Sequence, residues 1–173
     1  MQKSTWIFGL LAGVLSALIE YLFFKSTVSN SVVMYVSKIV ILSFCIIFGL
    51  ILAKKLLGGT ISIGRTLFIG GLISFIRAII LIISFLILYY PDGNFYQPSV
   101  KIAFEQATKK VEEDINIKPA DKAMKLEENK KQIASQYEPI GYSLIAIGAS
   151  ITTGLILSIP MAAFISTNMM YKK

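Results

Sequence analysis

The stretch TLFIGGLISFIRAIILIISFLILYY, residues 66–90, decides the fold. It is dominated by apolar residues and carries one charged side chain, that of Arg77. A helix needs about 20 mainly apolar residues to cross a hydrocarbon core of roughly 30 Å. The stretch lacks the alternation of apolar and polar residues that a membrane β-barrel strand requires. It therefore predicts a transmembrane helix.

Three further stretches have the same character, at about residues 6–24, 32–53 and 140–169. The chain of 173 residues is 55% hydrophobic and 16% charged, whereas about a quarter of a typical soluble domain is charged. The first stretch is longer than a usual signal-peptide core and contains Glu20, so we expect it to be retained. The sequence predicts an all-α fold: an integral membrane four-helix bundle that forms a single membrane domain over residues 1–173.

Residues 91–139, between the third and fourth spans, have a different composition. Residues 92–139 hold 8 Lys and 9 acidic residues, which leaves Glu20 as the single acid in the rest of the chain. Apolar residues recur there at spacings of three and four, as on one face of a helix, and residues 116–119 indicate a break. We expect a helical hairpin that packs on itself or on a partner. Its two apolar stripes are Val100, Phe104, Ala107, Val111 and Ile115, and then Ala123, Leu126, Ile133 and Tyr137.

Basic residues beside the spans predict the orientation, because loops rich in Lys and Arg stay in the cytoplasm. We expect both termini on the cytoplasmic side of the cytoplasmic (inner) membrane and the 91–139 hairpin on the extracytoplasmic side. No basic patch occurs in a water-exposed domain, so nucleic acid is not an expected partner. The basic residues on the predicted cytoplasmic side are Lys3, Lys54, Lys55, Arg65, Lys172 and Lys173.

Small residues recur every four positions along each span, which lets helices approach closely in lipid. The favoured interpretation is packing within the bundle, and the alternative is a homodimer through one such face. The candidate helix-packing residues are Gly9, Gly13, Gly70, Ser150, Gly154 and Ser158.

Three charged residues fall within the predicted spans: Glu20, Lys38 and Arg77. Such residues are costly in hydrocarbon and often mark functional sites. Glu20 and Lys38 lie at similar depth, and Arg77 lies near the midplane, from which its long side chain can reach outward. In the first interpretation Glu20 neutralises Lys38 or Arg77, so that Glu20→Ala would leave Arg77 unpaired. In the second, the cluster lines a cavity for an anion or a polar head group, and in the third the side chains reach the interface unpaired.

Reactive residues are scarce. The chain has no His and a single Cys, Cys45, which excludes histidine-dependent triads, an intramolecular disulfide and Cys-cluster metal sites. We therefore expect no catalytic residue, no metal ligand, no cofactor and no enzymatic activity.

The second loop and third span carry a family resemblance. The run Lys54-Lys55, Gly58-Gly59, Ile61-Ser62, Thr66-Leu67-Phe68 and Gly70-Gly71 resembles a family of small bacterial membrane proteins, common in Bacteroidota, catalogued as domain of unknown function 4199 (DUF4199). The whole layout is also similar, with four spans and a charged helical insertion before the last. The resemblance implies a cytoplasmic-membrane protein without an assigned activity.

Two functions remain open at this point. The leading hypothesis is a non-enzymatic subunit or accessory protein of a membrane complex, which meets a membrane-protein partner or a second copy of itself. The alternative is an oligomeric transport protein or a lipid- or anion-binding protein that uses the intramembrane Glu-Lys-Arg cluster. The lipid bilayer is a partner in both.

Overall fold

The computed structural model describes residues 2–25, 31–90 and 95–166. This part of the chain is helical and has four helices long and apolar enough to cross a membrane. The predicted all-α fold with four spans is confirmed. The end of the fourth predicted span, residues 167–169, lies outside the described residues. The four long helices are α1 (Gln2–Lys25), α2 (Ser31–Leu56), α3 (Ile63–Tyr89) and α6 (Pro139–Ser166).

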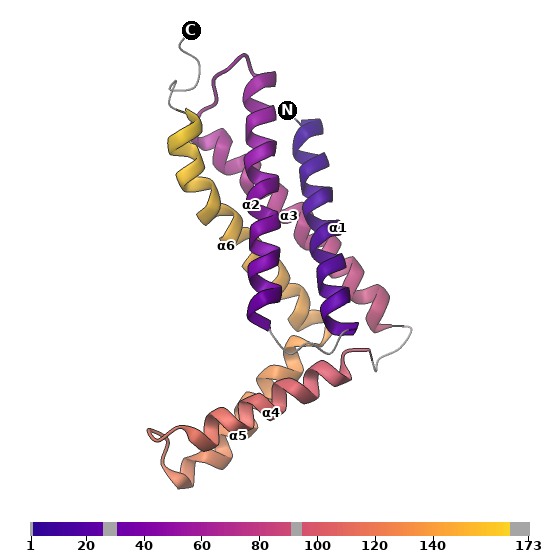
Figure 1. Cartoon of the computed structure of the whole chain (residues 1–173), viewed down its shortest axis with the longest axis vertical. Helices are drawn as coiled ribbons and strands as arrows, with labels where there is room; N and C mark the ends of the chain where they lie inside the picture. The colour runs from indigo at the N-terminus through magenta and orange to yellow at the C-terminus, as the bar shows by residue number, and fades with distance from the viewer. Residues whose placement is uncertain (1, 26–30, 91–94, 167–173) are drawn as a thin grey trace.

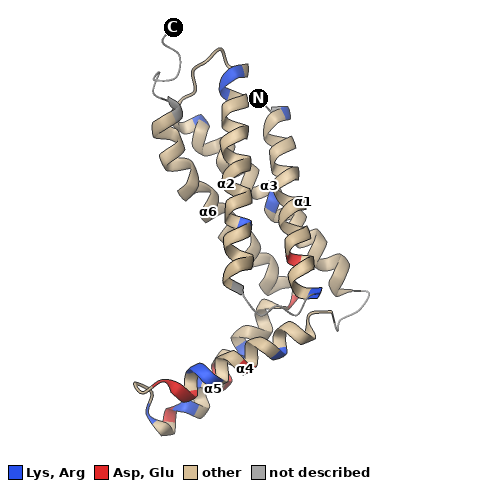
Figure 2. Cartoon of the chain, in the orientation of Figure 1, with Lys and Arg blue, Asp and Glu red and all other residues tan. Residues whose placement is uncertain are grey.

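Successive long helices run antiparallel in a bundle, with α4 (Gln97–Glu113) and α5 (Pro119–Gln136) beyond one end of it (Figure 1). The start of α1, the α2–α3 connection and the end of α6 lie together at the opposite end (Figure 1). Charged residues are concentrated on α4 and α5 and near the ends of the bundle, while most of each long helix carries none (Figure 2). This distribution is the one that a bilayer around the bundle requires.

The α2–α3 connection begins with a tight glycine turn. Gly58 and Gly59 have φ values of 77° and 93°, a region that side-chain-bearing residues rarely adopt. The amide of Gly59 donates to the carbonyl of Lys54 at 2.9 Å, and that of Gly58 donates to Lys55 at 3.4 Å. This pair of bonds is a Schellman motif, which satisfies the last carbonyls of α2. Helix α3 then begins at Ile63, earlier than the predicted residue 66, because Ser62 caps it by accepting the amide of Arg65.

Helices α3 and α6 make the closest contact in the bundle, through small residues on both sides. A Cβ added at Gly70 would collide with Ser158, and one added at Gly154 would collide with Ser74. Both serine hydroxyls donate to carbonyls of their own helix, Ser74 to Gly70 and Ser158 to Gly154. Their polar atoms are therefore satisfied at a site where the two backbones meet, as expected for helix association in lipid.

Helix α1 packs on α3 through glycines as well. Gly9 lies against Ile76 and Gly13 lies against Ile80, each too close to admit a Cβ. The buried apolar core occupies the end of the bundle near the α2–α3 turn. It comprises Ala12, Leu42, Cys45, Ile46, Leu50, Ala53, Ile61, Ile69 and Ile73.

Helices α4 (Gln97–Glu113) and α5 (Pro119–Gln136) form the predicted hairpin. Its first stripe is wrong at one position, because Ile115 lies beyond the end of α4 and is 96% exposed. The physical cause is Asp114, whose carboxylate accepts the amide of Asn116 at 2.9 Å. This local turn replaces the next helical turn. Pro119 then opens α5, where its missing N–H is not needed.

Candidate functional site

An aromatic cluster joins the hairpin to the bundle. Tyr96, at the start of α4, stacks on Phe85 of α3 at 4.5 Å and meets Phe24 of α1 edge-on at 5.0 Å between ring centroids. Phe85 also stacks on Tyr142 of α6, at 3.9 Å between ring centroids. Tyr137, at the end of α5, lies 6.2 Å from Tyr96. Rings from three spans and both hairpin helices therefore fix the hairpin at this end of the bundle.

The phenols of this cluster that lie outside the spans resist ionisation. Burial raises the pKa of Tyr96 above its ordinary 10.0, and the Glu20 carboxylate raises it further. Burial likewise raises the pKa of Tyr137. Both side chains are therefore neutral at physiological pH.

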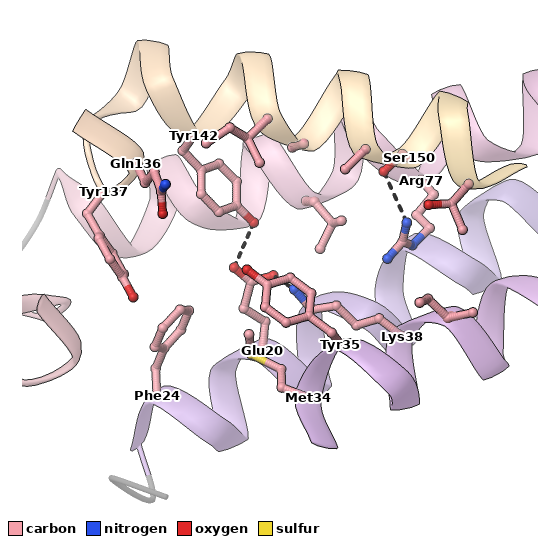
Figure 3. Close-up of a pocket in the computed structure, with 16 residues that line it drawn as sticks. Glu20, Phe24, Met34, Tyr35, Lys38, Arg77, Gln136, Tyr137, Tyr142 and Ser150 are labelled. Carbon is pink, nitrogen blue, oxygen red and sulfur yellow. Dashed lines mark hydrogen bonds and ion pairs between the residues drawn. The ribbon is translucent and has the colours of Figure 1, made fainter. Parts of the chain in front are cut away.

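Beneath the aromatic cluster lies a cavity of about 180 Å³ (Figure 3). It extends from Gln136 and Tyr137 at the end of the hairpin to Arg77 of α3 and Ser150 of α6, deep in the bundle. Helices α1, α2, α3 and α6 all contribute side chains. All three intramembrane charges predicted from the sequence line it: Glu20, Lys38 and Arg77.

The outer part of the cavity holds a closed polar network. Lys38 donates from Nζ to Oε2 of Glu20 at 2.6 Å, and both side chains are about nine-tenths buried. Tyr142 donates its hydroxyl to the other carboxylate oxygen, Oε1, at 2.7 Å. A charged pair in an apolar setting needs such added hydrogen bonds to offset its desolvation. Glu20 thus has a neutralising partner from α2 and a hydrogen-bond donor from α6.

Arg77, at the inner end of the cavity, is 6% exposed and has different partners. Its Nε donates to the hydroxyl of Ser16 at 2.9 Å, and its Nη1 donates to the hydroxyl of Ser150 at 3.0 Å. In the described chain no buried side-chain nitrogen or oxygen lacks a hydrogen bond. Neither serine is bonded to Nη2, and the Arg77 side chain lines the cavity (Figure 3).

The structure thus pairs Glu20 with Lys38, whereas Arg77 bonds to the two serines and forms no ion pair with Glu20. Within residues 2–25, 31–90 and 95–166, no acidic side chain lies within ion-pair distance of Arg77. The partners of Tyr142 and Ser16 could not be inferred from the sequence. Ser150 was assigned to helix packing and also binds the guanidinium. The feature of the sequence that could have pointed to Ser16 and Ser150 as partners of a buried charge is that each is a polar residue within an otherwise apolar helix.

Fold and site together define a multi-pass membrane protein with a charged cavity within its bundle. The chain belongs to the family described as Protein of unknown function (DUF4199), whose model matches residues 6–167. The resemblance of the second loop and third span to this family is therefore confirmed. No curated protein and no solved structure matches the chain.

Proposed function

We propose that this protein is a non-enzymatic membrane protein that binds an anionic group at Arg77. One observation carries the proposal: Arg77 is a deeply buried cation whose contacts in the described chain are two neutral hydroxyls. Hydroxyls orient a guanidinium but do not neutralise it. A buried charge without a counter-charge is costly, and such residues usually serve a ligand or an ion.

The charge balance of the cavity supports an anion rather than a cation. Its charged lining consists of Glu20, Lys38 and Arg77, a net charge of +1. The Glu20 carboxylate is already engaged by Lys38 and Tyr142. The guanidinium is thus the charged group in the lining that still has a free face.

The packing of the bundle supports binding rather than conduction by a single chain. Beyond the cavity, α3 and α6 touch through Gly70 and Gly154, and the buried core occupies the remaining half of the bundle. The cavity therefore ends inside the protein. Transport along this route would need an oligomer.

Thermal unfolding in a neutral maltoside detergent tests the proposal. Acetate, inorganic phosphate and laurate are added at constant ionic strength to the wild type, to Arg77→Gln and to Arg65→Gln, whose arginine is exposed at the far end of the bundle. A ligand that binds only the folded state raises its stability by mass action. We expect at least one anion to raise the Tm of the wild type and of Arg65→Gln, but not that of Arg77→Gln. Equal shifts in all three proteins, or none in any, would contradict the proposal.

A second function, as accessory subunit of a membrane complex, rests on the hairpin. Ile115 is 96% exposed and Met124 is 69% exposed, on an element whose surface is otherwise mostly charged. A partner protein or a second copy that covered these two side chains would remove their apolar surface from water, which is favourable. Crosslinking from Met124→Cys in a Cys45→Ala background, followed by native electrophoresis, would detect such a partner. A monomer without adducts would argue against this function.

We further propose that both termini face the cytoplasm and that the hairpin lies outside it. Lys3, Lys54 and Arg65 all belong to the bundle end opposite the hairpin, in accord with the rule for basic loops; Lys172 and Lys173 lie outside the described residues. A membrane-impermeant maleimide should label Met124→Cys in intact cells. It should label Thr60→Cys, in the α2–α3 turn, only after lysis. The reverse pattern would invert the topology.

A further inference from the structure

The size of the cavity limits what it can enclose. Its volume is about 180 Å³, whereas sites that enclose a whole small molecule usually measure ~300–1,000 Å³. The cavity therefore has room for a head group and a short part of the tail attached to it. Any larger ligand must leave through an opening.

The opening lies between α2 and α6 and faces the hydrocarbon. Tyr35 and Ile39 of α2 and Ile145 of α6 line the cavity, yet they are 58%, 43% and 47% exposed. All three belong to candidate membrane spans, so their exposed surfaces meet lipid chains. A ligand that leaves by this side enters the bilayer and not water, which favours an amphiphile.

The depth of Arg77 selects a small head group. From Arg77 to Tyr89, the end of α3 nearest the hairpin, the helix rises ~18 Å, which puts the guanidinium near the middle of a core of about 30 Å. A diacyl phospholipid would have to bring its glycerol and both chains well below their usual level to place its phosphate there. A single-chain lipid with a small head avoids this cost.

The N–H donors of Arg77 that neither serine uses indicate the chemical nature of the head group. Nε and one N–H of Nη1 are used by Ser16 and Ser150. Of the five donors of an arginine, the second N–H of Nη1 and those of Nη2 remain. The Nη1 and Nη2 hydrogens that lie side by side match the two oxygens of a carboxylate. A carboxylate also carries the single negative charge that balances the cavity, whereas a dianionic phosphate would leave an excess.

We infer that the ligand is a long-chain carboxylate of the fatty-acid type, an inference that rests on the proposed anion site. Its carboxylate is bound by Nη1 and Nη2 of Arg77. Its acyl chain passes between α2 and α6 into the leaflet on the hairpin side. The Glu20–Lys38–Tyr142 network forms the polar outer wall and does not contact the carboxylate.

A chain-length series in lipid nanodiscs tests this inference. Acetate, octanoate and laurate share the carboxylate, while 1-dodecanol shares the chain of laurate without its charge. We expect the concentration that gives the half-maximal rise in Tm to fall by at least ~100-fold from acetate to laurate, because the chain partitions into the bilayer beside the opening. Dodecanol should have no effect, and Arg65→Gln should behave as the wild type.

Three variants locate the ligand. Arg77→Gln should abolish the laurate effect, and Arg77→Lys, which keeps the charge but not the paired donors, should weaken it about tenfold. Should Arg77→Gln fail to fold, Ala149→Phe provides a second route, because Ala149 lines the cavity and a phenyl ring there would fill it. A laurate analogue with a photoactivatable group at mid-chain should label α2 and α6 peptides in the wild type and lose that labelling in Ala149→Phe.

The outcomes separate the inference from the proposed function. If acetate or inorganic phosphate acts through Arg77 as strongly as laurate, the ligand is a free anion; the inference is then wrong and the anion site stands. If dodecanol equals laurate, the inference is wrong; if no anion acts through Arg77, the inference and the anion site are both wrong. Labelling confined to α1 and α3 would contradict the route between α2 and α6.

Discussion

The hydroxyl of Tyr142 donates to Oε1 of Glu20 at 2.7 Å, although 122 positions separate the two residues in the chain. The same tyrosine ring stacks on Phe85, which also stacks on Tyr96 at the start of the hairpin. One side chain therefore belongs both to the polar network of the cavity, where Figure 3 shows its bond to Glu20, and to the aromatic cluster that holds the hairpin.

Tyr142→Phe separates these two roles, because it keeps the ring and removes the hydroxyl. A hydrogen bond to a charged group contributes ~1.5–3 kcal/mol, so we expect a loss of that size in unfolding free energy in detergent. Tyr90→Phe is the matched control, since Tyr90 is 73% exposed and should be unaffected. Equal stabilities of the two variants would show that the Glu20 contact contributes nothing.

Glu20→Ala should destabilise the bundle more than Lys38→Ala. Removal of one partner of a buried ion pair costs ~3–5 kcal/mol. The carboxylate accepts hydrogen bonds from both Lys38 and Tyr142, whereas Lys38 has the carboxylate and a looser contact, 5.7 Å from the centroid of the Tyr35 ring. The sequence suggested that Glu20→Ala would leave Arg77 unpaired, whereas in the structure it removes the hydrogen-bond partner of Lys38 and Tyr142. The double variant Glu20→Ala, Lys38→Met should recover part of the loss in thermal unfolding. Strictly additive effects would mean that the pair is not coupled.

Gly154→Ala should weaken the contact between α3 and α6. Its added methyl would meet Ser74, and overpacking of this kind costs ~1–3 kcal/mol. Gly148→Ala, in the same helix, is the control, because nothing lies within 4 Å of the added Cβ. It should be neutral or stabilising by up to ~1 kcal/mol, owing to the better helix propensity of Ala. A Tm for Gly154→Ala equal to that of Gly148→Ala would contradict the close approach.

Alkaline pH should loosen the hairpin through Tyr96. The folded-state pKa of Tyr96 is raised above the ordinary 10.0 by burial and by the Glu20 carboxylate, so the folded protein holds this proton more tightly than the unfolded chain. Its stabilising contribution is complete below pH 10 and is lost as pH rises through the folded pKa. The Tm measured from pH 8 to 12 should fall above pH 10, and less steeply in Tyr96→Phe. Identical profiles would exclude Tyr96 as the cause.

The spans could be predicted from sequence because nearly every residue of a helix in the hydrocarbon core must be apolar, whichever helix it packs against. The similar depth of Glu20 and Lys38 in the membrane could also be predicted. Glu20 lies a few residues before the end of the first span, and Lys38 lies a few residues after the start of the second. The two hairpin helices could be predicted from helical periodicity, but not every position of their apolar stripes: Ile115 lies beyond α4, Tyr137 lies beyond α5 and Ala123 is exposed.

The partners of Arg77 could not be predicted in this way. Ser16 and Ser150 lie 61 and 73 positions from it in the chain, and they reach it only because α1 and α6 both pack on α3. Helix neighbours in a membrane depend on shape at small residues, and Gly or Ser in an apolar helix fits several arrangements. The sequence therefore identified the charge and its approximate depth, but not its surroundings.

The glycine–serine contact between α3 and α6 holds α6 against the bundle. Gly154 and Ser158 hold the second half of α6 against α3, while the first half carries Ile145 and Ala149 beside the cavity and continues from the hairpin. Because α6 runs from the end of the hairpin past the cavity to this contact, one helix forms part of the cavity wall and also joins the bundle to the element that projects beyond it.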